Sequence, residues 1–149
     1  GIPIAGDGMV YGEFDLTFFK RLLVAAQPRE GDHFYDLGSG YGRLVLAAAL
    51  LYPDLWNSCT GVELLPELYN AAMNARSAFE QIDALSAMPI APVDFKMADV
   101  YEIDLSAADV CFSYSVTWDQ DLDGLFLTTL SEVLGKNCKE GTRVITIDL

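Results

Sequence analysis

The chain has 149 residues, of which 52% are hydrophobic, and a formal net charge of −13 at pH 7. This length suits one domain without surplus for a second, and the apolar content excludes general disorder. No apolar run approaches the roughly 18 residues that span a bilayer. The start at Gly1 lacks the basic region and cleavage site of a signal peptide. We therefore expect an intracellular protein (cytoplasmic, nuclear or mitochondrial) that is neither secreted nor bound in a membrane.

The negative net charge favours some classes of binding partner over others. A negative domain is ill suited to grip nucleic-acid phosphates, because that requires clustered Lys and Arg. It can attract a basic substrate such as a Lys-rich tail, although solubility alone also explains the charge. Cys59, Cys111 and Cys138 lie far apart and His33 is the only histidine, so neither a zinc site nor a disulfide framework is expected.

Hydrophobic periodicity predicts helices alternating with strands. The expected helices cover residues 13–26, 43–51, 66–85 and 122–134. The expected strands cover residues 33–37, 59–63, 93–97, 109–114 and 142–149. This alternation implies an α/β fold, an open and mostly parallel sheet of five strands with helices on both faces. Ligands of such a sheet bind outside the carboxyl ends of the strands, at the topological switch point.

The strongest feature is a glycine-rich segment, residues 36–42 (Asp-Leu-Gly-Ser-Gly-Tyr-Gly), between a predicted strand and a predicted helix. Glycines allow a sharp turn and a close approach to a ligand, and the helix N-terminus offers N–H groups and the positive end of its dipole. Glu63 follows Gly42 by 21 residues, at the end of the second strand. A carboxylate there can accept hydrogen bonds from two ribose hydroxyls, which indicates a nucleotide-like ligand.

The spacing of the glycines distinguishes between nucleotide-like ligands. It is G-x-G-x-G with an acid two residues ahead, not the dinucleotide pattern G-x-G-x-x-G. Residues 36–42, 61–63 and 98–100 resemble, in the right order, three motifs of class I S-adenosylmethionine-dependent methyltransferases. The resemblance implies a Rossmann-like fold, S-adenosyl-L-methionine as cofactor, Glu63 on its ribose and Asp99 near its adenine amino group. Glu63 as a surface residue and Asp99 as a turn cap are the alternatives.

A second resemblance indicates which class of molecule accepts the methyl group. Residues 10–16 (Val-Tyr-Gly-Glu-Phe-Asp-Leu) are similar to the cofactor-covering segment of the telomeric-silencing-disruptor (DOT-type) histone lysine methyltransferases, with a shorter spacer. Residues 36–49 and 61–66 equally resemble small mitochondrial protein-lysine methyltransferases. Both families methylate lysine, so the resemblance implies an acceptor protein with an exposed lysine. We expect one cofactor-binding domain over residues 1–149, with residues 1–30 forming a cofactor-covering segment and helix.

The resemblance assigns two sets of residues. The expected cofactor-binding residues are Tyr11, Glu13, Asp36, Gly38, Ser39, Gly40, Gly42, Glu63, Leu64, Asp99 and Val100. The expected catalytic residues, which would line the lysine channel, are Ser113, Tyr114 and Tyr11.

The segment around Ser113 departs from the histone enzymes, which carry Asn-Asn-Phe after the fourth strand where this chain has Phe-Ser-Tyr-Ser (residues 112–115). Ser113 can offer a hydroxyl and Tyr114 an aromatic wall, or both are ordinary strand-end residues. Trp118 is a further candidate for an aromatic slot that lowers the pKa of a lysine by burial and attracts methylated ammonium groups.

Several other readings of the chain are weaker. Residues 119–124 copy the first half of a calcium loop, but position twelve is Leu130 instead of Glu, so no metal site is expected. An RNA or small-molecule methyltransferase and an inactive scaffold subunit stay open, whereas a nicotinamide-dependent oxidoreductase is disfavoured. Class I enzymes usually end with an antiparallel hairpin after the fifth strand, and this chain stops there. Either the sequence is a fragment or a partner covers that edge.

Overall fold

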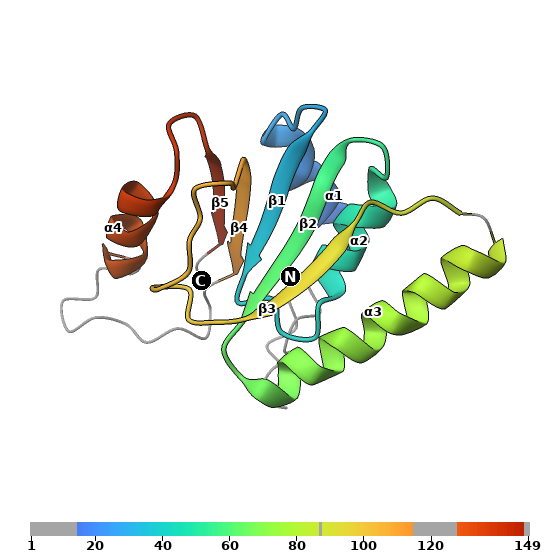
Figure 1. The fold of residues 1–149 in the computed structure, drawn as a ribbon. Helices are drawn as coiled ribbons and strands as arrows, with labels where there is room; N and C mark the ends of the chain where they lie inside the picture. Colours follow the sequence, from blue (N-terminus) through green and yellow to red (C-terminus); the bar gives the residue numbers. More distant parts are fainter. Residues whose placement is uncertain (1–14, 87, 115–127, 148–149) are drawn as a thin grey trace.

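The computed structural model describes residues 15–86, 88–114 and 128–147 (Figure 1). These residues form four helices, which are α1 (Leu16–Ala25), α2 (Arg43–Leu51), α3 (Pro66–Ser86) and α4 (Thr128–Asn137). They also form five strands, which are β1 (Asp32–Leu37), β2 (Trp56–Glu63), β3 (Val93–Met97), β4 (Val110–Tyr114) and β5 (Arg143–Ile147). The alternation of helices and strands predicted from the sequence is confirmed.

The strands form one sheet in the order β3-β2-β1-β4-β5, and every neighbouring pair is parallel. The chain moves outward from β1 through β2 to β3, then returns to the other side of β1 to add β4 and β5. The switch point therefore lies between β1 and β4, where Asp36 pairs with Phe112. Open α/β sheets bind ligands at this point, outside the carboxyl ends of the strands.

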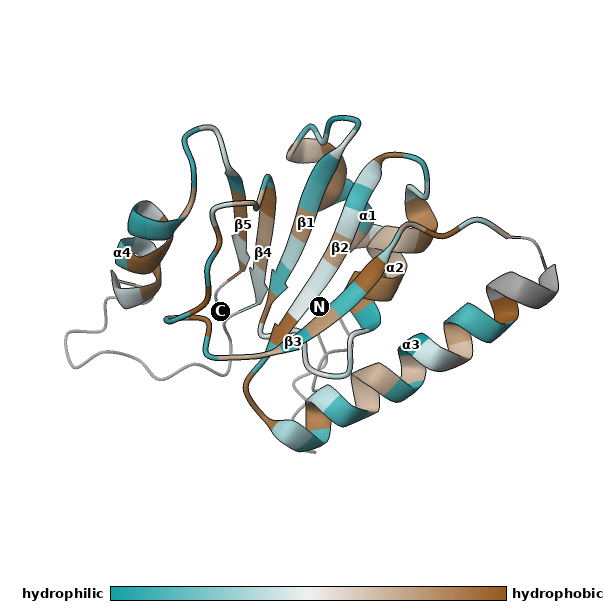
Figure 2. Ribbon diagram, viewed as in Figure 1, coloured by the Kyte–Doolittle hydropathy of each residue, from teal (hydrophilic) through white to brown (hydrophobic). Residues whose placement is uncertain are grey.

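Each face of the sheet has its own core. On one face, α1, α2 and α3 pack over Phe34, Phe95 and Phe112. On the other face, Leu130 and Leu134 of α4 pack among the residues of β1, β2 and β4. Figure 2 shows α2 mostly brown and α3 alternating between brown and teal, as expected for a helix that is largely buried and one that lies half in water. The two cores explain the near-continuous burial of β1, β2 and β4.

The predicted bounds of helices and strands agree best with the structure where the local sequence determines them. Helix α2 and strand β3 have the predicted bounds, whereas β2 begins at Trp56, three residues before its predicted start. Trp56 is buried in the core beside Phe34, and its indole N–H donates to the carbonyl oxygen of Ala48 in α2, at 3.1 Å. That contact with another element is invisible in a local pattern, so the strand was predicted too short.

The first and last helices also differ from their predicted ranges. Helix α1 starts at Leu16 because the side chain of Asp15 accepts a hydrogen bond from the N–H of Thr17 at 2.8 Å and caps it. Helix α4 continues to Asn137, three residues beyond its predicted end, and residues 122–127 lie outside the described residues. The calcium-like segment 119–124 also lies outside the described residues. Within the described ranges, no helix combines the length and apolarity needed to cross a membrane.

Candidate functional site

The glycine-rich segment forms a tight loop between β1 and α2. Gly38, Gly40 and Gly42 have φ angles of +82°, +55° and +82°, which residues with a side chain rarely adopt. The N–H groups of Gly38 and Ser39 donate to the carbonyl oxygen of Val62 at 2.8 and 2.9 Å, which draws the loop over the end of β2. Gly42 is the N-cap of α2 and provides no capping side chain. The loop therefore presents the N-terminus of α2 at the carboxyl edge of the sheet, as a binding site for an anionic group requires.

Glu63 connects this loop to the second strand. Its Oε2 accepts a hydrogen bond from the N–H of Gly40 at 2.8 Å, and its Oε1 accepts one from the N–H of Leu65 at 3.1 Å. The side chain is 8% exposed, so it is a fixed part of the site. A carboxylate has about four lone-pair positions. Glu63 therefore retains acceptor capacity for the hydroxyl pair of a ribose.

Asp36 is the second acid of the site and lies on the same face of the sheet as Glu63. It is the last residue but one of β1, pairs with Gly61 and is 3% exposed. Burial raises the pKa of its carboxyl group to about 7, and the negative charge of Glu63 adds to the increase. A buried carboxyl with such a pKa is ready to ionise when a cation approaches, so Asp36 suits a cationic ligand group.

The residues after β3 form a turn at the same edge of the sheet. The carboxylate Oδ1 of Asp99 accepts the N–H of Tyr101 at 2.9 Å, so Asp99 does cap a turn. The N–H of Ala98 donates to the backbone oxygen of Glu63 at 3.1 Å, which places this turn beside the end of β2. Leu64 is exposed and Val100 is buried in the core on the α4 face. Leu64 thus offers an apolar surface next to Glu63, whereas Val100 mainly anchors the turn.

Two buried hydroxyl groups in this region have no hydrogen-bond partner among the described residues. They are the Oγ atoms of Ser39, in the glycine loop, and Ser113, near the end of β4. Leaving a buried hydroxyl without a hydrogen bond costs about 1–3 kcal/mol. Native folds therefore contain few such groups, and each of them has a specific cause. An additional polar partner at the glycine loop would satisfy Ser39. The residues present therefore fit a bound polar ligand there.

The candidate catalytic residues are distributed over both faces of the sheet. Tyr114 is half-buried on the face that carries Asp36, where it packs against the aromatic core. Ser113 is fully buried and pairs with Leu37, so it points to the opposite face. The two side chains therefore do not share one wall. Tyr11, Glu13 and Trp118 lie outside the described residues.

Sequence reasoning overlooked one residue of this neighbourhood. Phe95 of β3 is 5% exposed, and its ring contacts the positions of Gly42 and Gly61. The sequence predicted a strand over residues 93–97, but a local pattern could not show which loop the side chain of Phe95 meets. The register that pairs Gly61 with Phe95 supplies this information.

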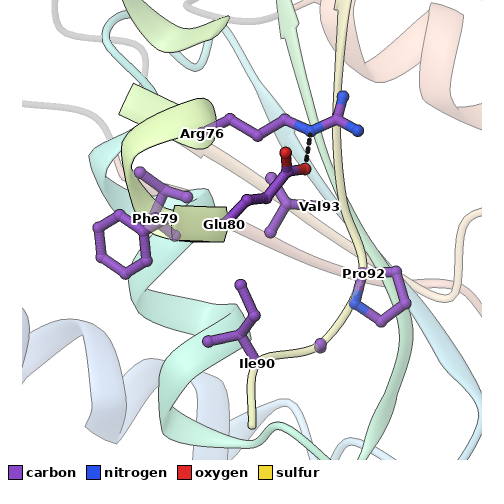
Figure 3. Close-up of a pocket in the computed structure, with 8 residues that line it drawn as sticks. Arg76, Phe79, Glu80, Ile90, Pro92 and Val93 are labelled. Carbon is purple, nitrogen blue, oxygen red and sulfur yellow. Dashed lines mark hydrogen bonds and ion pairs between the residues drawn. The ribbon is translucent and has the colours of Figure 1, made fainter. Parts of the chain in front are cut away.

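Two cavities lie apart from these acids. One of about 420 Å³ is bordered by apolar side chains of α1, α2 and α3, with Tyr41 of the glycine loop at its rim. The other, of about 190 Å³, lies under α3 (Figure 3), where Arg76 Nε pairs with Glu80 Oε1 at 3.0 Å. Neither is lined by Asp36 or Glu63. In the part of the chain that the structure describes, no group of three His, Cys, Asp or Glu residues could hold a metal ion.

Solved methyltransferase structures share this fold. An RNA methyltransferase from Salinibacter ruber, in complex with S-adenosyl-L-homocysteine, is 29% identical with a TM-score of 0.63, covering 87% of this chain and 73% of its own. A SAM-dependent methyltransferase from Thiobacillus denitrificans, in complex with the same compound, is 17% identical with a TM-score of 0.62, covering 95% and 51%. Geranyl diphosphate C-methyltransferase from Streptomyces coelicolor A3(2) is 19% identical with a TM-score of 0.65, covering 89% and 43%. The chain thus spans between 43% and 73% of the length of these three proteins.

The parallel sheet, the glycine loop at its switch point and the likeness to these structures together define a class I S-adenosylmethionine-dependent methyltransferase fold. No curated protein sequence matches the chain. A family model does, however, and it is described as histone methylation protein DOT1 and matches residues 5–148. The chain belongs to this family, and the resemblance seen in its motifs is confirmed.

Proposed function

We propose that this protein transfers the methyl group of S-adenosylmethionine to a lysine side chain of an acceptor protein, with a histone-like or other Lys-rich acceptor. The observation that carries the acceptor class is the match to the histone methylation family over residues 5–148. The net charge of −13 supports a basic acceptor, because an acidic surface attracts one and repels a phosphate backbone.

The cofactor would be held by groups at the carboxyl edge of the sheet. Glu63 would accept the ribose hydroxyls, while the N-terminus of α2 would receive the carboxylate of the methionine moiety. Asp36, with its raised pKa, would ionise against the cationic amine of that moiety. Asp99 would meet the adenine amino group beside Leu64. When bound, the cofactor supplies a methyl group on a positively charged sulfur.

The work left to the chain is to position and deprotonate the acceptor. The lysine nitrogen forms the new bond to carbon as the carbon–sulfur bond breaks, which releases S-adenosylhomocysteine and one proton. Because only a neutral amine can attack, the channel must lower the pKa of the lysine by burial and exclude water. Tyr114 would form an aromatic wall on the side of Asp36, together with Tyr11, and Ser113 would offer a hydroxyl if the channel reaches the other face.

RNA methylation is the second candidate function. It is favoured by the 29% identity to an RNA methyltransferase from Salinibacter ruber. The charge argues against it, because the chain carries nine Lys and Arg residues against 22 Asp and Glu residues. Direct contacts to RNA phosphates would require a basic surface, which this composition does not favour.

The test begins with cofactor binding and continues to the acceptor. Calorimetric titration of the purified chain with S-adenosylhomocysteine, with NAD as control ligand, should give heat with the first only. Transfer of labelled methyl groups is then measured onto core histones, onto a histone mixture whose lysines are chemically blocked, and onto total RNA. Label on the unblocked histones alone supports the proposal. Label on RNA would favour the second candidate, and binding without transfer to either would favour a scaffold subunit.

A further inference from the structure

One aromatic ring fills the space beside two glycines of the site. A Cβ atom added at Gly42 would lie 2.5 Å from Cζ of Phe95, and one added at Gly61 would lie 2.6 Å from its Cδ1. Real Cβ atoms essentially never come within 3.0 Å of another heavy atom in this way. The same side chain therefore excludes a side chain at both positions, although they are separated by α2.

The need for glycine at position 61 is a matter of space alone. Gly42 also has a φ angle of +82°, which by itself favours glycine, whereas Gly61 is absent from the glycines with positive φ. Glycine weakens a strand interior and marks a close approach of another group. Two groups approach Gly61, because its added Cβ would also lie 2.6 Å from the Oγ of Ser39. The loop and the ring of Phe95 therefore meet over this one residue.

These contacts link the two halves of the proposed cofactor site. Gly42 is the N-cap of α2, and Gly61 lies two residues before Glu63 on the same strand. Phe95 is buried and belongs to β3, which pairs with β2 so that Phe95 lies beside Gly61. A flat, rigid ring between Gly42 and Gly61 sets how far the start of α2 stands from the end of β2. It thereby sets how the N–H of Gly40 meets the carboxylate of Glu63.

We propose that Phe95 is a positioning residue for the cofactor. Through its contacts with Gly42 and Gly61, it holds the glycine loop against β2 in the geometry that binds S-adenosylmethionine. This inference rests on the proposed function, since it assumes that the cofactor occupies the glycine loop and Glu63. A smaller, flexible side chain at position 95 leaves the loop free to shift, and a misplaced binding group weakens the complex even when the fold survives.

The experiment compares two Phe→Leu changes in the same core. Phe95→Leu alters the ring beneath the loop, whereas Phe19→Leu alters an equally buried ring of α1 that packs on Phe34 and Phe112. Both should lower the melting temperature. The dissociation constant for S-adenosylhomocysteine, measured by calorimetry, should rise roughly tenfold or more in Phe95→Leu only. An equal rise in both variants would overturn the inference, because the role of Phe95 would then be core packing alone.

A double change tests the contact itself. Gly61→Ala should weaken cofactor binding because its methyl group collides with the ring of Phe95 and with the Oγ of Ser39. Adding Phe95→Leu should relieve the collision with the ring and leave the one with Ser39. The rise in dissociation constant for the double variant should therefore fall clearly below the product of the two single rises. A rise equal to that product would overturn the inference, and if Gly61→Ala fails to fold, the two Phe→Leu variants decide. Absence of binding by the unaltered chain would contradict the proposed function first, and the inference with it.

Discussion

The carboxylate of Glu63 accepts a hydrogen bond from the backbone N–H of Gly40, at 2.8 Å. The acid at the end of β2 is thus part of the structure of the glycine loop before any ligand arrives. Since its other oxygen accepts the N–H of Leu65, the carboxylate is held in one orientation. Such preorganisation reduces the ordering that ligand binding must otherwise impose.

Glu63→Gln should therefore weaken S-adenosylhomocysteine binding by more than the loss of a surface charge would. The amide places an N–H₂ group where one backbone N–H now donates, and hydrogen bonds to a charged acceptor are worth about 1.5–3 kcal/mol. We expect the dissociation constant to rise roughly 10- to 100-fold. Glu67→Gln, an exposed acid in the first turn of α3, is the matched control in the same calorimetric titration. Similar effects of the two changes would contradict this role for Glu63.

Cofactor affinity should depend on pH through Asp36. Its pKa of about 7 means that the carboxyl is largely protonated at pH 6 and ionised at pH 8. Because the cofactor amine is cationic, the ionised form should bind better, so the affinity should rise over this range and level off above pH 8. Binding near pH 7 should release a proton, which calorimetry in buffers of different ionisation enthalpy detects. In Asp36→Asn the affinity should be lower and should hardly change with pH. If the affinity of this variant still rose with pH, the released proton would come from another group.

The same group should make the stability of the ligand-free protein fall as pH rises. Between the unfolded value near 3.8 and the folded value of about 7, the folded state binds more protons at Asp36 than the unfolded state does. The free energy of unfolding then declines by up to about 1.4 kcal/mol per pH unit. Above pH 7 the contribution of Asp36 no longer changes with pH. Asp36→Asn removes the decline. In urea unfolding, the free energy of unfolding of the variant should therefore increase relative to that of the unaltered chain from pH 5 to pH 8. A difference that stays constant with pH would contradict the role of Asp36 in this decline.

Asp109, at the opposite edge of the sheet, should show the reverse dependence. Burial alone would raise the pKa of its carboxyl. Hydrogen bonds from Lys139 Nζ at 2.6 Å and from the N–H of His33 at 2.8 Å lower this pKa by more than burial raises it, so the net shift is downward. This contribution to stability is present above pH 4 and is lost as pH falls through the lowered pKa. Asp109→Asn should cost about 1–3 kcal/mol at pH 7 in urea unfolding, and less near pH 3.

A control for Asp109 is available in β3. Asp94 is 54% exposed and pairs with Arg76 at 3.5 Å. Exposed ion pairs of this kind contribute about 0–1 kcal/mol, so Asp94→Asn should change the free energy of unfolding little at either pH. Equal losses from the two Asp→Asn variants would show that the hydrogen bonds of Asp109 add nothing beyond those of an exposed pair.

The sequence predicted most of the elements because their limits are local. The α2 helix is an Ala/Leu segment that starts after Gly42 and ends before Pro53. The rule for parallel sheets also indicated correctly that the residues after β1 and β2 meet at one edge. This is why the glycine loop and Glu63 could be expected in one site, although the hydrogen bond between Gly40 and Glu63 was not predicted.

What could not be predicted depends on register and on contacts between elements. The packing of Phe95 under Gly42 and Gly61 requires the pairing of β2 with β3, which no local pattern contains. Asp36 was predicted near the cofactor from its motif, but its raised pKa comes from its burial in the folded chain and from the nearby charge of Glu63. The roles in cofactor and acceptor binding assigned to these residues stay predictions, and so do those of Tyr11, Glu13, Ser113 and Tyr114.

The central place of β1 has a consequence for how the molecule is made. Asp109 meets the N–H of His33 across 76 positions of the chain, and Arg143 reaches Asp32 across 111. A nascent chain leaving the ribosome therefore carries β1 with one side unpaired until about 75 further residues have been synthesised. Topologies dominated by such distant pairings fold slowly, in milliseconds to seconds, and exposed strand edges invite aggregation meanwhile. In refolding experiments, protection of the β1 amides that bond to β2 should precede formation of the contacts with β4.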